Sequence, residues 1–210
     1  MRYTKFLMVL AVLILSGLLA IQINAGPKGQ GKGKGLKPPA PVSQTGQTSC
    51  YATDGSSIPC DGTGQDGEYQ MGVICPEPRF TYNEDGTVTD NCTGLVWLED
   101  ANCVGRKSWD DAISFCNDLA SGGCGLTDGS IAGEWRLPNI FELFSLLDFG
   151  ETNPALPPGH PFSIFDQQTW SSSTHIRQTY RAWHVHFNDG RVQYSDKINE
   201  DNVWCVRGDN

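Results

Sequence analysis

The chain has 210 residues, of which 39% are hydrophobic and 19% are charged, and its formal net charge at pH 7 is −9. The charges are divided along the sequence: all 24 acidic residues lie after Cys50, whereas only nine of the 15 basic residues do. A strongly acidic domain repels phosphate and sulfate polymers, which argues against nucleic acid and sulfated glycan as its main ligand.

Residues 1–25 are expected to be an export signal. Arg2 and Lys5 precede an apolar run over residues 6–21, and Ile23-Asn24-Ala25 offers a small-residue cleavage site. The alternative is an uncleaved membrane anchor, because the run approaches the roughly 20 apolar residues that span a bilayer. Both alternatives place the rest of the chain in a secreted, periplasmic or cell-envelope location, in an oxidising space where disulfides persist.

Residues 26–49 are rich in Gly, Pro, Lys and Gln, a composition typical of a flexible linker. Residues 50–78 follow as a short lead-in that contains cysteines. About 160 residues from Cys50 onward are enough for one hydrophobic core and short for two. We therefore expect one α+β domain over residues 79–210, with two helices packed on a small, mostly antiparallel sheet.

The first elements of the domain are strands and turns. Residues 50–60 indicate a short turn closed by its own disulfide. Residues 79–90 predict a β-hairpin around Asn83-Glu84-Asp85-Gly86, because Asp-Gly favours a turn with positive φ. The apolar run over residues 95–98 predicts a buried strand.

Two helices are marked by residues that favour the N-cap position. Ser108 precedes the first helix, which Gly122-Gly123 is expected to end. Asn139 precedes the second helix, and Glu142 lies where a capping-box acid reaches back to the cap amide. The apolar face of the second helix is expected to be formed by Ile140, Leu143, Phe144 and Leu147.

The last third of the chain predicts strands separated by turns, after an irregular loop over residues 151–165. The predicted strands cover residues 170–173, 182–187, 192–194 and 203–206. In the second of these, Trp183, Val185 and Phe187 alternate with His184 and His186. We expect the first three in the core and the two imidazoles on the solvent-facing side. Two imidazoles on one strand face can also bind a transition metal if a third ligand converges.

Five segments in a fixed order resemble a known family. They are Phe80-Thr-Tyr-Asn-Glu-Asp-Gly-Thr-Val-Thr-Asp-Asn-Cys-Thr-Gly-Leu-Val-Trp97, Ser108–Ile113, Trp135–Leu143, Thr169–Thr174 and Cys205–Arg207. Over Arg79 to Arg207 the chain resembles the bacterial family named for the C-terminal domain of the Legionella collagen-like protein. The resemblance implies an exported surface or envelope domain, related in fold to C-type lectin-like domains, with adhesion or glycan binding. The namesake has long collagen repeats and binds a sulfated glycan. This chain has only a short Gly/Lys stretch, so we do not expect trimerisation through collagen, and its acidic domain is poorly suited to a sulfated ligand.

Eight cysteines behind an export signal predict a disulfide framework. They allow on the order of one hundred pairings, among which sequence alone does not choose. Cys50 with Cys60 is the first expectation, because the two close a short loop. Cys116 with Cys205 follows from the family resemblance, since it matches the helix-to-last-strand bridge of lectin-like domains. The remaining pairs would be Cys75 with Cys92 and Cys103 with Cys124.

Other side chains that could bind a metal or take part in catalysis are expected to have structural roles. The acidic loops over residues 61–68 and 83–90 could hold a structural calcium ion, although neither matches the EF-hand pattern. No cysteine pair has the spacing of a zinc knuckle, and no metal site is expected. Arg136 and Glu142 could form a catalytic pair, but an ion pair at the helix start is the simpler interpretation.

The six tryptophans are candidates for the core or for stacking against a sugar. Four fall on predicted apolar faces and are expected in the core: Trp97, Trp109, Trp183 and Trp204. The pattern does not place Trp135 and Trp170, which therefore remain candidates for ligand contact.

The preferred function is a binding or adhesion module without catalysis or cofactor, whose partner is an extracellular glycan or cell-surface polymer and not nucleic acid. One alternative is an enzyme, by analogy with the formylglycine-generating enzymes, which share the lectin-like fold and use reactive cysteines. Another is a purely structural envelope protein. The oligomeric state is not specified by the sequence.

Overall fold

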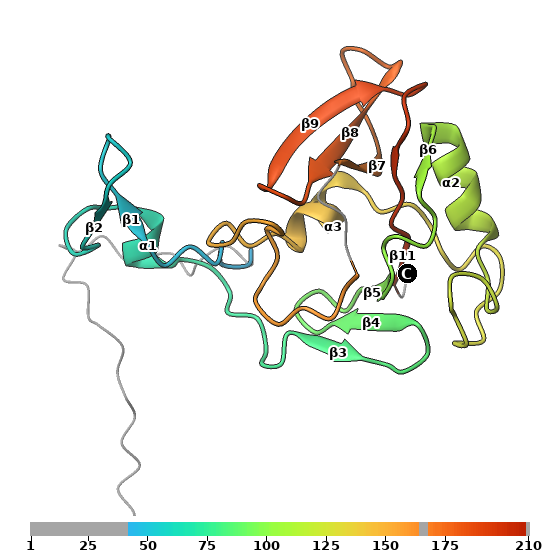
Figure 1. Ribbon diagram of the computed structural model, residues 1–210, viewed down its shortest axis with the longest axis horizontal. Helices are drawn as coiled ribbons and strands as arrows, with labels where there is room; N and C mark the ends of the chain where they lie inside the picture. Colours follow the sequence, from blue (N-terminus) through green and yellow to red (C-terminus); the bar gives the residue numbers. More distant parts are fainter. Residues whose placement is uncertain (1–41, 164–167, 209–210) are drawn as a thin grey trace, which may run out of the picture. The chain divides into compact units, whose positions relative to one another are not determined.

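The computed structural model describes residues 42–163 and 168–208 (Figure 1). The expected signal over residues 1–25 and the linker up to residue 41 lie outside the described residues. The described part has an α+β architecture of small antiparallel and mixed sheets joined by long loops. Within it, no helix has the length and apolar character that a membrane span requires.

The lead-in contains two short strands and one helical turn. β1 (Cys50–Tyr51) and β2 (Ser57–Ile58) make a two-stranded antiparallel hairpin, and α1 (Asp66–Tyr69) is a single helical turn. The Cys50–Cys60 disulfide closes this hairpin, as expected from its short loop.

A four-stranded antiparallel sheet has the order β11-β5-β4-β3. Its strands are β3 (Phe80–Tyr82), β4 (Thr87–Asp90), β5 (Val96–Leu98) and β11 (Val206–Arg207). The predicted hairpin and the predicted buried strand are both present. The turn depends on Gly86, whose φ is +83° and whose missing Cβ would lie 2.7 Å from the carbonyl oxygen of Gly125.

A five-stranded sheet has the order β6-β10-β7-β8-β9, in which only β10 and β7 pair in parallel. Its strands are β6 (Arg106–Lys107), β7 (Gln168–Thr174), β8 (Arg181–His186), β9 (Arg191–Asp196) and β10 (Asp201–Asn202). The prediction of a single strand over residues 203–206 is therefore wrong. Residues 203–205 link β10 of this sheet to β11 of the other, so the chain changes sheets there.

Two helices contact the five-stranded sheet: α2 (Trp109–Asp118) lies against β7, and α3 (Ile140–Ser145) against β7 and β8. Both predicted caps are present, and Asn139 and Glu142 form the expected capping box. The prediction that Gly122-Gly123 ends the first helix is wrong, because Leu119 already has extended ψ of 135°. The amide of Gly122 instead donates to the Leu126 carbonyl within a separate turn.

The core lies between these elements and contains four fully buried tryptophans, Trp97, Trp135, Trp170 and Trp204. The Trp204 ring contacts Trp97, Phe162 and Phe187, with centroid distances of 5.2, 4.9 and 5.4 Å. Its indole N–H donates to the Leu98 carbonyl at 2.9 Å, which satisfies the one polar atom of the buried ring. The sequence pattern left Trp135 and Trp170 as ligand candidates, and their complete burial rules out that role.

Four disulfides pair all eight cysteines: Cys50–Cys60, Cys75–Cys92, Cys103–Cys124 and Cys116–Cys205. These pairs coincide with those expected from the sequence and the family resemblance. Cys116 and Cys205 are completely buried and join α2 to the segment before β11. The covalent framework therefore fixes the first long helix against the end of the chain.

Candidate ligand-binding face

Four aromatic side chains gather on one face of the β8–β9 hairpin and the loop before it, and we call them the aromatic cluster: His175, Tyr180, Trp183 and Tyr194. Trp183 and Tyr194 are directly paired across the two strands, and their rings are 5.3 Å apart at right angles. The His175 ring lies 5.1 Å from Trp183 and 4.4 Å from Tyr194. Tyr180 and Tyr194 are 56% and 40% exposed, so the cluster is a surface feature.

The cluster exists because Trp183 is half-buried at the surface and not in the core as predicted, whereas Val185 and Phe187 are fully buried as predicted. Ala182 and His184 are buried, whereas Trp183 is only half-buried, so the expectation that Trp183 lies in the core and His184 faces solvent is wrong. The reason is a partner distant in sequence: His184 Nδ1 lies 2.8 Å from the Asp201 carboxylate in β10. That hydrogen bond gives the Nδ1 atom of the buried imidazole a partner inside the protein, and the indole of Trp183 lies on the opposite side of the strand.

Charged groups surround the rings of the cluster. The Arg181 guanidinium lies 5.3 Å from the Tyr180 ring and 5.4 Å from the Tyr194 ring, within the range of a cation–π contact. Arg181 Nε also donates to Asp196 at 2.5 Å. The cluster thus combines apolar ring faces with a fixed pair of hydrogen-bonding groups.

A second tryptophan expected in the core, Trp109, is also half-buried. Its indole N–H donates to the Ser171 carbonyl at 2.8 Å, and the Lys197 ammonium lies 3.7 Å from its ring. Lys197 also donates to the Thr174 hydroxyl at 2.9 Å. The expectation of a core position is wrong for Trp109 because the first residue of α2 lies at the sheet margin, where a lysine covers the ring.

A groove of 720 Å³ lies on the same face of β9 as Tyr194. Val192 lines the groove, and residues two apart in a strand point to the same side. The opposite wall is made by α3 and the residues after it, including Phe141, Phe144 and Phe149. Phe144, predicted on the apolar face of this helix, is 43% exposed and lines the groove, and Phe141 is 80% exposed. The third wall is formed by residues 42–45.

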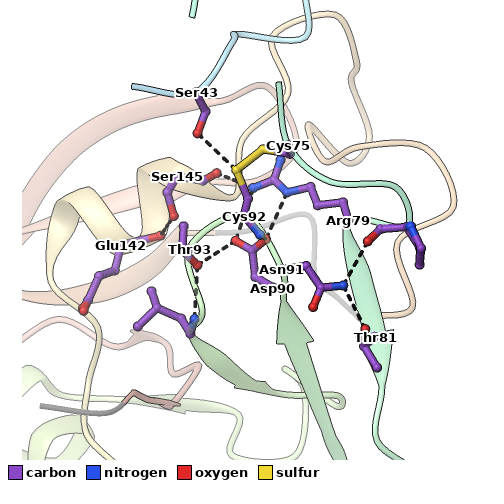
Figure 2. A network of polar contacts seen from close by, with 12 residues as sticks. Ser43, Cys75, Arg79, Thr81, Asp90, Asn91, Cys92, Thr93, Glu142 and Ser145 are labelled. Carbon is purple, nitrogen blue, oxygen red and sulfur yellow. Dashed lines mark hydrogen bonds and ion pairs between the residues drawn. A yellow bond between two sulfur atoms is a disulfide. The ribbon is translucent and has the colours of Figure 1, made fainter. Parts of the chain in front are cut away.

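A polar network around Asp90 holds the groove wall in place (Figure 2). The fully buried Asp90 carboxylate accepts from the Cys92 amide at 3.0 Å and from the Thr93 hydroxyl at 2.9 Å. Arg79 Nε lies 3.3 Å from the same carboxylate, and Arg79 Nη2 donates to the Ser145 carbonyl at 2.5 Å. One buried ion pair therefore joins the β3–β4 hairpin to the end of α3.

The same network reaches the lead-in through the Cys75–Cys92 disulfide, drawn in yellow in Figure 2. Cys92 lines the groove, whereas Cys75 and Arg79 line a second, adjoining hollow of 550 Å³. The disulfide thus stands between the two hollows, and the hairpin, α3 and the lead-in meet at this point.

The buried histidine pair lies on the face of β8 opposite the aromatic cluster. The rings of His184 and His186 are 5.1 Å apart, and among the residues that the structure describes the buried Nε2 atoms of both have no hydrogen-bond partner. Burial, followed by the charges of His184 and Arg191, lowers the pKa of His186 below its usual value. Among the described residues no group of three or more His, Cys, Asp or Glu side chains is arranged to hold a metal ion.

In the acidic loops that were considered for calcium, carboxylates accept hydrogen bonds from groups of the same loop. Glu68 accepts from the amides of Gly62 and Gly64 at 2.9 and 2.7 Å. Asp85 accepts from the amide and hydroxyl of Thr87 at 3.0 and 2.6 Å. These carboxylates therefore stabilise turns.

Arg136 and Glu142 form a bidentate ion pair with distances of 2.7 and 2.6 Å. Burial raises the pKa of Glu142, but hydrogen bonds from Arg136 and from the Asn139 amide outweigh it, so the pKa lies below its usual value. The same carboxylate completes the capping box, and the pair stabilises the start of α3.

The sequence pattern missed most of the candidate face. Tyr180, Tyr194 and His175 were not singled out, because their convergence depends on the β8–β9 register. The one local signal is the alternation of Val192 and Tyr194 in a strand that follows a tight turn.

Comparison with known families gives one match: residues 86–207 match the family described as the Lcl C-terminal domain. A comparison with curated proteins finds no match. The family match covers more than half of the chain and includes α2, α3 and the β8–β9 hairpin. The chain belongs to the Lcl C-terminal domain family.

Proposed function

We propose that this protein is an exported binding module of the cell envelope or its surroundings, and that its ligand is an extracellular glycan. The aromatic cluster is the observation that carries the proposal. Sugar rings present C–H groups on their faces and hydroxyls on their rims. The partly exposed rings of Trp183 and Tyr194 offer apolar faces to the sugar C–H groups. The adjoining Arg181–Asp196 pair offers hydrogen-bond donors and acceptors to the sugar hydroxyls.

The four disulfides support an oxidising extracellular or envelope location for this module. The Cys116–Cys205 bridge between α2 and the last segment of the chain supports a relation to C-type lectin-like domains, as the family resemblance implies. A rigid, cross-linked domain holds its surface rings in fixed positions, which lowers the entropy lost on binding.

A glycan array probed with the exported protein, with and without calcium, tests the proposal. We expect binding to one class of neutral glycan, unchanged by calcium. Trp183→Ala and Tyr194→Ala should each weaken that binding on the order of tenfold, since one aromatic contact contributes about 1 kcal/mol. Tyr82→Ala is the matched control, because Tyr82 is a similarly exposed strand tyrosine outside the cluster. Absence of binding on every array would favour the structural envelope protein.

An enzyme with cysteine chemistry is the second candidate, and thiol titration of the native protein separates it from the binding module. Pairing of all eight cysteines supports a titre of zero. One or two reactive thiols in the native protein would favour the enzyme instead.

A further inference from the structure

We propose that the outer edge of β9 is a strand-addition site for an extended, basic peptide segment of a partner protein. This site uses the backbone edge of β9, adjoins the proposed glycan face at Tyr194, and adds a second binding activity to the module. β9 is the last strand of the five-stranded sheet and, with six residues, the longest edge strand in the described part of the chain. In that part, the only partner of β9 is β8.

The hydrogen-bonding phase of the hairpin shows which backbone groups point outward. The Lys197 amide donates to the Tyr180 carbonyl at 2.9 Å, so Tyr180 and Lys197 form a hydrogen-bonded pair, and the next pair, Arg181 with Asp196, is non-hydrogen-bonded. Hydrogen-bonded and non-hydrogen-bonded pairs alternate in an antiparallel ladder. The N–H and C=O groups of Val192 and Tyr194 therefore point away from β8, and no backbone group of the described residues bonds to them.

The side chains beside this edge favour an apolar alternation in the added strand. Val192 and Tyr194 point to the groove face, and Phe141 and Phe149 lie across the groove. A strand added to β9 would place every second side chain over the groove, because strand side chains alternate between faces. Apolar residues at those positions would cover exposed phenylalanine surface.

The features by which proteins commonly block an edge strand are missing from β9. Its six residues include no proline or lysine, and its register with β8 continues without a bulge. The charged residues, Arg191 and Asp196, stand at the two ends and are already paired with Asp189 and Arg181. The centre of the edge, from Val192 to Ser195, is uncharged.

Charge selects a basic peptide over a second copy of the chain. All 24 acidic residues and only nine basic residues lie from Cys50 onward, so two domains repel each other. A peptide that carries lysines on both sides of its apolar alternation is attracted by the net negative charge of the domain.

Hydrogen exchange of the exported protein with a synthetic peptide, Lys-Lys-Val-Thr-Val-Thr-Val-Lys-Lys, tests the site. At millimolar peptide we expect the Val192 and Tyr194 amides to exchange at least tenfold more slowly, with no change at Gln193 and Ser195, which already bond to β8. The same peptide N-methylated at alternate residues on its pairing edge should give no protection. Unchanged exchange at Val192 and Tyr194 with the unmodified peptide would overturn the proposal.

Val192→Pro removes one outward N–H while leaving the bonds to β8 in place. We expect it to abolish peptide protection at Tyr194, with Gln193 and Ser195 still protected as evidence that the hairpin is intact. Gln193→Ala is the control that keeps the edge and should bind the peptide normally. Glycan binding by Val192→Pro should persist, so the two proposals fail separately. Protection that appears without peptide and grows with protein concentration would mean that a second copy occupies the edge, and would contradict the proposal.

Discussion

At the scale of single residues, polar partners accompany the burial of two ionisable side chains, Asp90 and His184. Asp90 is fully buried because Arg79, an amide and a hydroxyl satisfy its carboxylate, and the buried His184 has the Asp201 carboxylate as a hydrogen-bond partner at 2.8 Å. Removal of one partner leaves the other buried without a hydrogen bond. This lowers the free energy of unfolding by more than the loss of a solvent-exposed ion pair does.

Asp90→Ala should lower the free energy of unfolding by about 3 kcal/mol, because it leaves the Arg79 guanidinium and two donors without their acceptor. Asp189→Ala is the matched control: it breaks the exposed pair with Arg191 and should cost about 0–1 kcal/mol. Urea unfolding of both variants measures the difference, and equal losses would contradict the assigned role of the network.

Protonation of His186 should weaken the fold in acid. The pKa of His186 in the folded protein is lowered by burial, so the unfolded chain takes up the proton first as pH falls. Stability is therefore fully present above the unfolded pKa of about 6.5 and is lost as pH falls below it. Burial also lowers the pKa of His160, so protonation of His160 adds to the loss of stability as pH falls.

Urea unfolding between pH 7.5 and 5 on His186→Gln and the unchanged protein measures this effect. We expect a shallower loss of stability in the variant, with the remaining slope due in part to His160. Parallel curves for the two proteins would exclude the contribution of His186.

At the scale of elements, local rules account for the caps and the turns. Ser108 and Asn139 accept from the first free amides of α2 and α3, and Gly86 supplies the positive φ of the β3–β4 turn. These features depend on residues a few positions apart, and each was predicted. The end of α2 was not, because Leu119 takes an extended conformation and is buried in the core.

Gly86→Ala should destabilise the protein by about 2–3 kcal/mol, because the new methyl group meets a carbonyl oxygen and the residue must keep a positive φ. Gly129→Ala is the control, since Gly129 has φ of +73° with open space around it, and should cost about 1 kcal/mol. Thermal unfolding of the two variants checks the order. A larger loss for Gly129→Ala would contradict the close approach at Gly86.

At the scale of the whole molecule, the disulfides differ in what they constrain. Cys50–Cys60 closes a separation of 10 residues inside the lead-in, whereas Cys116–Cys205 closes one of 89 residues across the core. A longer closed loop removes more entropy from the unfolded chain.

Replacement of Cys116 and Cys205 together by serine should cost about 4–5 kcal/mol, against about 3 kcal/mol for Cys50 and Cys60. The first change should also lower the midpoint of global unfolding, and the second should affect mainly the lead-in. Denaturant unfolding followed by tryptophan fluorescence separates them, because the six tryptophans all lie outside the lead-in. A larger midpoint shift for the lead-in pair would refute this assignment.

The sequence by itself determined the features that depend on near neighbours: the hairpin turn, both helix caps, the short disulfide loop and, through its ordered motifs, the family. It also indicated that residues 182–187 form a strand of alternating character. Alternation alone leaves open which set of side chains faces inward.

Tertiary structure decided that question, and with it the candidate face. Asp201 lies 17 positions after His184, and only the β10–β7–β8 arrangement brings the two together. Trp183 points to the opposite face of β8 from that imidazole and pairs with Tyr194, and of the two residues on this face Val185 is buried and Trp183 is half-buried. Trp135 and Trp170 are buried for the same kind of reason, since Ser130 and the Lys107 carbonyl accept their indole N–H groups within the assembled core. The indole N–H groups of these two rings are paired with groups that only the folded chain brings to them.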